Sequence, residues 1–273
     1  MLLGIDIGGT TISLGLVDGK TIVSKVQVPS FPENASLDET LDYLSGEIAK
    51  VITPEVTRIG IGVPTLVDVE RGIVYEAQNI PSWKEVHLKE DLEARFGRPV
   101  SVNNDANCYA LGAAARLGMQ DSSLVCITLG TGTGVGIVFD GKLYCGANCG
   151  AGEICSLPYL DSILEAYCSK QFFENRGFNA RAASKAAEAG NPGAMALFDE
   201  FGHHMGVLLS MVMYAYDPAC IVIGGGVANA HPLFLPAMER TLSEKYQYPH
   251  ALDRLRIEFM PESDLPVLGA SLL

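Results

Sequence analysis

Basic side chains are scarce in this sequence. Its 273 residues include 19 Lys and Arg against 32 Asp and Glu, which leaves a formal net charge of −13 at pH 7. A protein with that balance repels phosphate backbones and anionic lipid headgroups. The chain also lacks a stripe of Lys and Arg residues. We therefore expect neither a nucleic acid nor a membrane surface among the partners of this protein.

Long apolar runs are lacking as well. Gly and Asp residues interrupt each hydrophobic stretch well before it reaches the length that crosses a bilayer. Met1 is followed by Leu-Leu-Gly-Ile-Asp, without the basic segment that opens an export signal. The seven cysteines show no paired spacing, as is usual where thiols stay reduced. These features predict a cytoplasmic protein without a membrane anchor.

Hydrophobic residues make up 48% of the chain and charged residues 19%, a balance typical of a globular protein. The first part is predicted to hold three meandering strands, then a helix, a strand, a helix, a strand and a helix. The expected ranges are 2–7, 12–17, 21–28, 37–48, 58–63, 88–92, 99–102 and 106–117. The meander begins again at Ser123, and helices fill most of the stretch 160–216. Strands near 219–223 and 255–259 and a last helix follow.

The repeated meander predicts an α/β protein with two similar domains and a cleft between them, where ligands usually bind. We expect an N-terminal α/β domain at 1–117 and a C-terminal α/β domain at 118–261. The last helix, at about 262–273, is expected to pack back on the first domain.

Glycine-rich turns follow equivalent strands in both halves. Without Cβ atoms, their backbone N–H groups can approach and cradle a phosphate, and Thr hydroxyls add donors. One such turn alone is as readily an ordinary hairpin, but two at corresponding positions favour phosphate binding. Asp6, which ends the strand before the first turn, can hold Mg²⁺ through a water molecule. The residues concerned are Gly8, Gly9, Thr10 and Thr11 in the first turn and Gly130, Thr131, Gly132 and Thr133 in the second.

A third glycine run, Gly224, Gly225 and Gly226, follows a strongly apolar strand. It offers a flat backbone surface on which an adenine or a ribose can lie. Taken singly, it is also consistent with a helix cap.

A carboxylate lies where a predicted strand passes into a helix. In the segment Asn103-Asn104-Asp105, Asp105 is placed at the positive N-terminus of the helix. Either Asn104 or Asp105 can cap the helix. A base that takes the proton of a sugar hydroxyl also needs a carboxylate here, and Asn104 can hold neighbouring hydroxyls. Both interpretations stay open, because caps at strand ends commonly line active sites.

Four segments, in this order and spacing, resemble the ROK family (repressors, open reading frames and sugar kinases). They are Asp6-x-Gly-Gly-Thr, Asn-Asp-Ala-Asn, Leu-Gly-Thr-Gly-x-Gly and Ile-Gly-Gly-Gly. The resemblance covers essentially the whole chain. It implies two actin-like ATPase (ribonuclease H-like) domains, ATP and Mg²⁺ in the cleft, and transfer of phosphate to a hexose hydroxyl.

The resemblance also implies roles for single residues. By resemblance, Asp105 would be the catalytic base, Asn104 would bind the sugar, and the glycine turns would hold ATP. Glu153 matches a family Glu that contacts sugar hydroxyls. Glu165 matches one near the anomeric end of the sugar, with a solvated helix charge as the alternative. Two more residues, Gln78 and Asn79, are expected to face the sugar.

The sequence departs from the family where many members carry a His and a Cys-rich zinc loop. Ser156 stands at the His position, and the short run 157–161 replaces the loop. We therefore predict no structural zinc, and we interpret Cys145, Cys149 and Cys155 as small, partly buried thiols. Because of this departure, the family resemblance is a weaker guide to which sugar the chain binds. Glucose is the first expected substrate, with N-acetylmannosamine, N-acetylglucosamine and fructose as alternatives.

Two other functions compete with the kinase. One is a non-catalytic sugar sensor, for which the chain offers no DNA-binding segment ahead of Leu2. The other is an actin-like assembly or chaperone ATPase, against which Glu153, Glu165 and the Asn104-Asp105 pair argue. By resemblance we expect a homodimer with a small sugar as its ligand.

Overall fold

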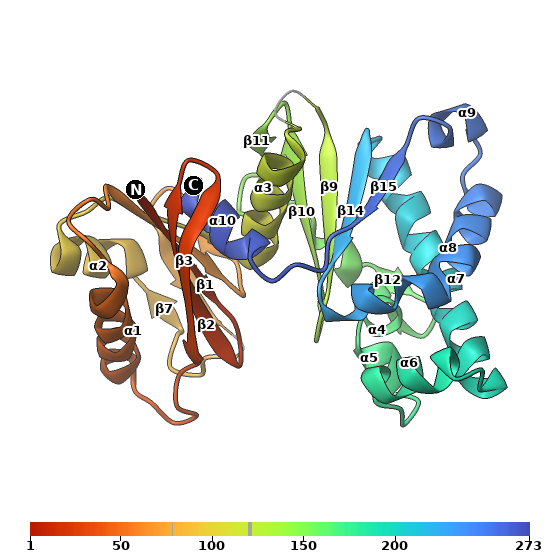
Figure 1. Ribbon diagram of the computed structural model, residues 1–273, viewed down its shortest axis with the longest axis horizontal. Coiled ribbons are helices and arrows are strands. Elements are labelled where there is room, and N and C mark those ends of the chain that lie inside the picture. Colours follow the sequence, from red (N-terminus) through yellow and green to blue (C-terminus); the bar gives the residue numbers. More distant parts are fainter. Residues whose placement is uncertain (78, 120–121) are drawn as a thin grey trace. The chain divides into compact units, whose positions relative to one another are not determined.

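The computed structural model describes residues 1–77, 79–119 and 122–273. By compactness the chain forms two units (Figure 1). Unit 1 consists of Met1–Asp121, Gly136–Ala151 and Asp264–Leu273, and unit 2 consists of Ser122–Val135 and Gly152–Ser263. The domain boundaries predicted at residues 117 and 261 stay a prediction. None of the helices in the described ranges is long and apolar enough to cross a membrane.

A five-stranded sheet in the order β3-β2-β1-β4-β8 forms the centre of unit 1. The strand β1 pairs antiparallel with β2 and parallel with β4, and β4 pairs parallel with β8. The strands are β1 (Leu2–Ile7), β2 (Thr11–Asp18), β3 (Thr21–Pro29), β4 (Arg58–Val63) and β8 (Val100–Asn104). The helices are α1 (Leu37–Val51), α2 (Leu88–Phe96), α3 (Asp105–Leu117) and α10 (Leu265–Ser271). A small sheet consists of β5 (Val67–Asp68), β6 (Ile73–Tyr75) and β7 (Glu85–Val86).

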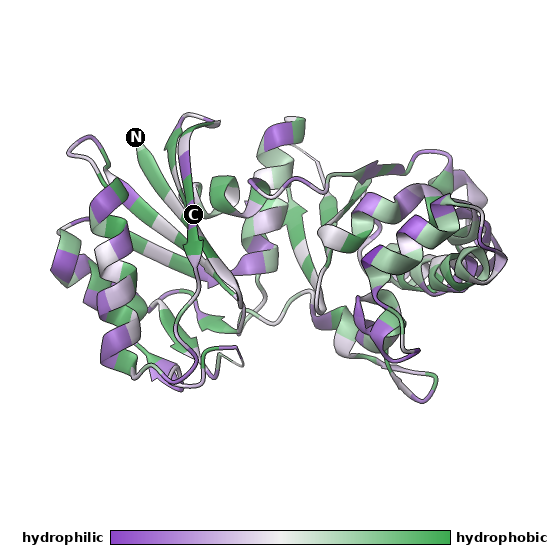
Figure 2. Cartoon of the chain, turned by 60° about the horizontal axis from the view of Figure 1, so that its bottom comes forward, coloured by the Kyte–Doolittle hydropathy of each residue, from purple (hydrophilic) through white to green (hydrophobic). Residues whose placement is uncertain are grey.

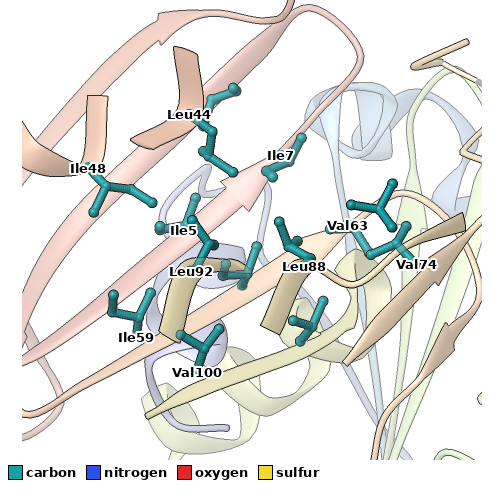
Figure 3. Packing of buried hydrophobic residues seen from close by; sticks show 14 of the residues in the cluster. Ile5, Ile7, Leu44, Ile48, Ile59, Val63, Val74, Leu88, Leu92 and Val100 are labelled. Carbon is teal, nitrogen blue, oxygen red and sulfur yellow. The ribbon is translucent and has the colours of Figure 1, made fainter. Parts of the chain in front are cut away.

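One face of the central sheet of unit 1 is apolar because every second residue of β1, β2 and β4 is Leu, Ile or Val. Figure 3 shows Ile5 and Ile7 of β1 beside Leu44 of α1 and Leu88 of α2. All four side chains are fully buried. In Figure 2 the strands are mostly hydrophobic, whereas the helices alternate hydrophobic and hydrophilic residues. This alternation fits helices that cover a sheet on one side and meet solvent on the other.

The opposite face of the same sheet carries glycines, and these let α10 approach closely. A Cβ atom on Gly4 would overlap the backbone carbonyl of Val267, and one on Gly60 would overlap that of Ala270. The helices α3 and α10 also meet directly, since a Cβ atom on Gly269 would overlap the carbonyl of Cys108. The C-terminal helix is therefore an integral part of unit 1.

The second five-stranded sheet has the order β11-β10-β9-β14-β15, and β9, β14 and β15 are parallel to one another. Its position-by-position order matches that of the first sheet, which confirms the predicted repeat. The strands are β9 (Leu124–Leu129), β10 (Thr133–Phe139), β11 (Lys142–Leu143), β14 (Cys220–Gly224) and β15 (Arg256–Phe259). The α/β fold class predicted from the sequence is confirmed.

The rest of unit 2 is mainly helical, and α7 packs along α8 (Figure 1). The helices are α4 (Leu164–Cys168), α5 (Gln171–Glu174), α6 (Ala180–Glu188), α7 (Pro192–Tyr216), α8 (His231–Lys245) and α9 (Pro249–Leu252). Two 3-10 turns are η1 (Glu153–Ser156) and η2 (Gly226–Ala230), and a short hairpin consists of β12 (Pro158–Tyr159) and β13 (Ser162–Ile163).

Candidate active site

The first glycine turn joins β1 to β2 in unit 1. The N–H group of Gly8 donates to the carbonyl of Thr11 at 2.9 Å, and the Ser30 hydroxyl donates to the carbonyl of Gly8 at 2.9 Å. Gly9 and Thr10, at the tip, are exposed. The Thr10 carbonyl accepts from the N–H group of Ser30 at 2.9 Å. The turn is thus a closed hairpin at its base, while its tip is exposed to solvent.

Asn104 caps the helix α3. Its Oδ1 atom accepts hydrogen bonds from the N–H groups of Ala106 and Asn107 at 2.9 and 3.3 Å. Its Nδ2 atom donates to the carbonyl of Thr65 at 3.3 Å, which occupies one of two amide protons. The capping function considered for either residue therefore falls to Asn104.

Asp105 is the first residue of α3 and is half-buried. One of its carboxylate oxygens accepts from the N–H group of Ala106 at 2.8 Å. This position at a helix N-terminus stabilises the ionised carboxylate. Gly62 of β4 makes room for the start of the helix, because a Cβ atom there would lie 3.5 Å from the Asp105 Cα atom and 3.1 Å from the Cys108 sulfur.

Asp6 and Asp105 influence each other electrostatically. The pKa of Asp6 is raised to about 7, mainly by burial and then by the negative charge of Asp105, while Lys25 partly opposes the change. Both carboxylates also raise the pKa of the buried Cys108 thiol, after the larger effect of burial. Two carboxylates held this near to each other are a donor set that a divalent cation would stabilise.

The second glycine turn, in unit 2, is held by Glu165 of α4. The Oε2 atom of Glu165 accepts from the N–H group of Thr133 at 2.9 Å, and Oε1 accepts from Nε2 of Gln171 at 3.1 Å. The Gly132 side of the turn lies so close that a Cβ atom there would overlap this carboxylate. The Thr133 hydroxyl donates to the carbonyl of Cys168 at 2.8 Å. Both oxygens of Glu165 therefore have partners within the turn and its neighbouring helix.

A pocket of about 630 Å³ in unit 2 contains residues from two of the three glycine segments predicted to bind the nucleotide. Gly130 and Thr131 of the second turn line it together with Gly226. Gly225 has a φ of 82°, and a Cβ atom there would lie 2.5 Å from the carbonyl oxygen of Leu129, so the third glycine run packs against the strand before the turn. The helix η2 begins directly after it, at Gly226.

The pocket also contains cationic side chains that motif reasoning missed. Lys170, Arg181 and Lys185 line it, and the last two come from α6. Cations beside backbone N–H groups suit a polyanionic ligand. The only sequence signal available was their spacing of four residues on a helix, which is too common to indicate a site.

Glu153 is exposed at the start of η1, and the Ser156 hydroxyl donates to it over a long 3.5 Å. The pKa of Cys155 is raised to about 12, mainly by burial and then by the charges of Glu165 and Glu153. Both glutamates therefore lie within electrostatic reach of one thiol in unit 2. Their predicted sugar contacts stay predictions.

Asn79 is exposed in unit 1, beside the first turn. A Cβ atom on Gly9 would lie 3.4 Å from the side-chain amide of Asn79. The two residues also line a smaller pocket of about 320 Å³ together with Phe31 and Pro81. The other predicted residue of this segment, Gln78, lies outside the described residues.

Comparisons with known proteins decide the family. The model of the ROK family matches residues 2–273. The chain belongs to the ROK family.

Two curated relatives and one solved structure illustrate this membership. The N-acetyl-D-glucosamine kinase of Aliivibrio salmonicida is 32% identical over 84% of this chain and 85% of its own length. The glucokinase of Thermotoga maritima is 30% identical over 99% of this chain and 96% of its own. The crystal structure of a ROK family glucokinase from Streptomyces griseus in complex with glucose and AMPPNP has a TM-score of 0.82 at 27% identity, covering 99% and 97% of the two chains.

Within the ROK family, the segment from Ser156 to Asp161 is the departure from the expected pattern. It forms the end of η1, the strand β12 and the turn that leads to β13. Across the described ranges, no group of three or more His, Cys, Asp or Glu residues could hold a metal ion. The expected lack of a structural zinc stays a prediction.

Proposed function

We propose that this ROK family chain is an ATP-dependent sugar kinase that phosphorylates a hydroxyl group of a hexose, with Asp105 as its general base. Sugar kinases among its relatives at about 30% identity support the activity. The observation that carries the assignment of the base is the half-buried Asp105 carboxylate in the first turn of α3, next to the capping Asn104.

Asp105 would accept the proton of the attacking hydroxyl as that oxygen bonds to phosphorus. The Ala106 N–H group fixes the position of the carboxylate, and the positive end of the helix favours negative charge there. Within the described ranges, Asn104 has one amide proton left beyond its bond to Thr65, and this proton can hold a neighbouring sugar hydroxyl. The proposed base and the proposed sugar ligand are thus adjacent residues at the start of α3.

Asp6 is the residue that would hold Mg²⁺, through water. Its raised pKa and its repulsion by Asp105 are both relieved by a divalent cation, which is why the residues present fit the ion. When bound, the cation neutralises charge on the transferred phosphoryl group.

The nucleotide is assigned to the 630 Å³ pocket of unit 2. The backbone N–H groups of the turn from Gly130 to Thr133 would cradle phosphate, and the run from Gly224 to Gly226 would lie against the adenine or the ribose. Lys170, Arg181 and Lys185 add positive charge around this polyanion.

The identity of the sugar is the finer part of the proposal. Glucose remains the first candidate, and the N-acetyl-D-glucosamine kinases among the relatives favour testing N-acetylhexosamines with equal weight. Asn79, Glu153 and Glu165 are the remaining candidate sugar contacts. The homodimer and the cytoplasmic location stay predictions.

The test is ADP release from Mg²⁺-ATP with a panel of hexoses and N-acetylhexosamines. We expect one sugar to stimulate turnover and Asp105→Asn to lower kcat by at least about 100-fold, the usual contribution of a general base. Asp18→Asn, an exposed carboxylate in the β2–β3 turn, serves as the matched control and should leave kcat unchanged. If no sugar raises turnover while calorimetry still detects sugar binding, the chain is a sensor and not a kinase.

A further inference from the structure

A pair of cysteines lies in the loop that follows β11 in unit 1. The loop is closed by a hydrogen bond from the N–H group of Ala151 to the carbonyl of Cys145, at 3.0 Å. Cys145 is half-buried, whereas Cys149 and the five other cysteines of the chain are buried. The loop therefore contains one thiol that is partly accessible to solvent and a second thiol that is buried.

Both sulfur atoms contact the same two asparagines, Asn103 of β8 and Asn107 of α3. Nδ2 of Asn103 donates to the Cys145 sulfur at 3.5 Å, and the Cys149 thiol donates to Oδ1 of Asn103 at 3.5 Å. Nδ2 of Asn107 lies 3.7 Å from each sulfur. Their shared partners thus keep the sulfur atoms adjacent.

The arrangement favours a thiolate on Cys145. The neighbouring Cys149 side chain, and after it Asn103, together lower the pKa of the Cys145 thiol to about 6, against the opposing effect of burial. The proximity of Cys145 and then burial raise the pKa of Cys149. A thiolate that is partly accessible is the form in which cysteine acts as a nucleophile.

The backbone of Cys149 is unusual as well. Its φ of 58° lies in the left-handed region, which a residue with a side chain rarely adopts. The conformation turns the Cys149 sulfur toward Asn103 and Asn107 rather than away from them. Outliers of this kind are maintained only where the surroundings fix them, and they cluster at functional sites.

We propose that Cys145 and Cys149 form a reactive dithiol site that reduces a low-molecular-weight disulfide and closes to an intramolecular disulfide. The Cys145 thiolate attacks one sulfur of the small disulfide and releases its other half as a thiolate. Cys149 then gives up its proton and attacks the Cys145 sulfur, which releases the second half. Two electrons pass to the small disulfide, and the two released thiolates take up protons as their own pKa values dictate.

This inference concerns thiol chemistry and goes beyond the kinase, so its test does not use turnover. The reduced full-length protein is treated with oxidised glutathione, and the products are followed by intact mass and by peptide mapping without reduction. We expect loss of two hydrogen atoms and a Cys145–Cys149 linked peptide, reversed by dithiothreitol. Alkylation of the native protein by iodoacetamide should label Cys145 first, with a pH midpoint near 6 instead of the usual value of about 8.5.

Three variants make the test decisive. Cys149→Ser should stop at a stable mixed disulfide on Cys145, Cys145→Ser should not react, and Cys155→Ala, which leaves the pair intact, should behave as the wild type. The proposal is wrong if the wild type also stops at the mixed disulfide, if other cysteines react first, or if alkylation of Cys145 shows an ordinary midpoint. Circular dichroism of each variant shows that a loss of reaction is not a loss of fold.

Discussion

Asp6 should give the protein a pH-dependent stability opposite in sign to that of most carboxylates. Its pKa is raised from 3.8 to about 7, mainly by burial and then by Asp105. Between about pH 4 and pH 7 the folded chain therefore keeps a proton that the unfolded chain has released, so the free energy of unfolding falls as the pH rises. We expect Asp6→Asn to be more stable than the wild type at pH 8, by an amount on the order of a few kcal/mol, and equal to it near pH 4.

The measurement is urea unfolding of both proteins from pH 4 to pH 8, with and without Mg²⁺. Mg²⁺ should stabilise the wild type at pH 8, where Asp6 is ionised, and should leave Asp6→Asn unaffected. A difference between the two proteins that stays constant with pH would show that Asp6 keeps an ordinary pKa.

At the scale of elements, α4 and the second glycine turn are coupled through Glu165. Removing its carboxylate with Glu165→Ala leaves the Thr133 N–H group without its partner, at a cost of about 1–3 kcal/mol. If the turn holds ATP, the KM for ATP should rise about tenfold, since a factor of ten corresponds to roughly 1.4 kcal/mol. Steady-state kinetics with each substrate varied in turn provide the measurement.

Glu153→Ala is the comparison for this experiment, because the described partner of that exposed carboxylate is only the Ser156 hydroxyl. We expect it to raise the KM for the sugar and to leave the KM for ATP unchanged. If Glu165→Ala instead raises the KM for the sugar alone, Glu165 contacts the sugar, as the family resemblance implies. Its hydrogen bond to the turn would then not be needed for ATP binding.

The strands could be predicted from the sequence, whereas the contacts around Asp6 and Glu165 could not. The strands at 2–7 and 58–63 have the predicted bounds because alternating and continuous apolar patterns are local properties of the chain. The contact of Glu165 with Thr133 joins residues that are 32 positions apart, and no local pattern encodes it. Arg181 and Lys185 were missed for the same reason, since only folding brings α6 to the pocket. The raised pKa of Asp6 likewise depends on burial and on Asp105.

At the scale of the whole molecule, the chain ends in the unit in which it began. The helix α10 packs on the glycine face of the first sheet, next to α3 (Figure 1). Asp264, just before it, lies 3.9 Å from both Lys25 and Arg116. Unit 1 is therefore incomplete until the last residues of the chain are in place.

Because α10 completes unit 1, we expect a single buried leucine of this helix to contribute strongly to the free energy of unfolding. Leu268 of α10 is 0% exposed, so Leu268→Ala should lower the free energy of unfolding by about 2–5 kcal/mol through lost burial and a cavity. Leu160, which is 71% exposed in unit 2, is the matched control, and Leu160→Ala should change stability by no more than about 0.5 kcal/mol. Chemical denaturation measures both. Equal losses would contradict the burial of Leu268 in α10.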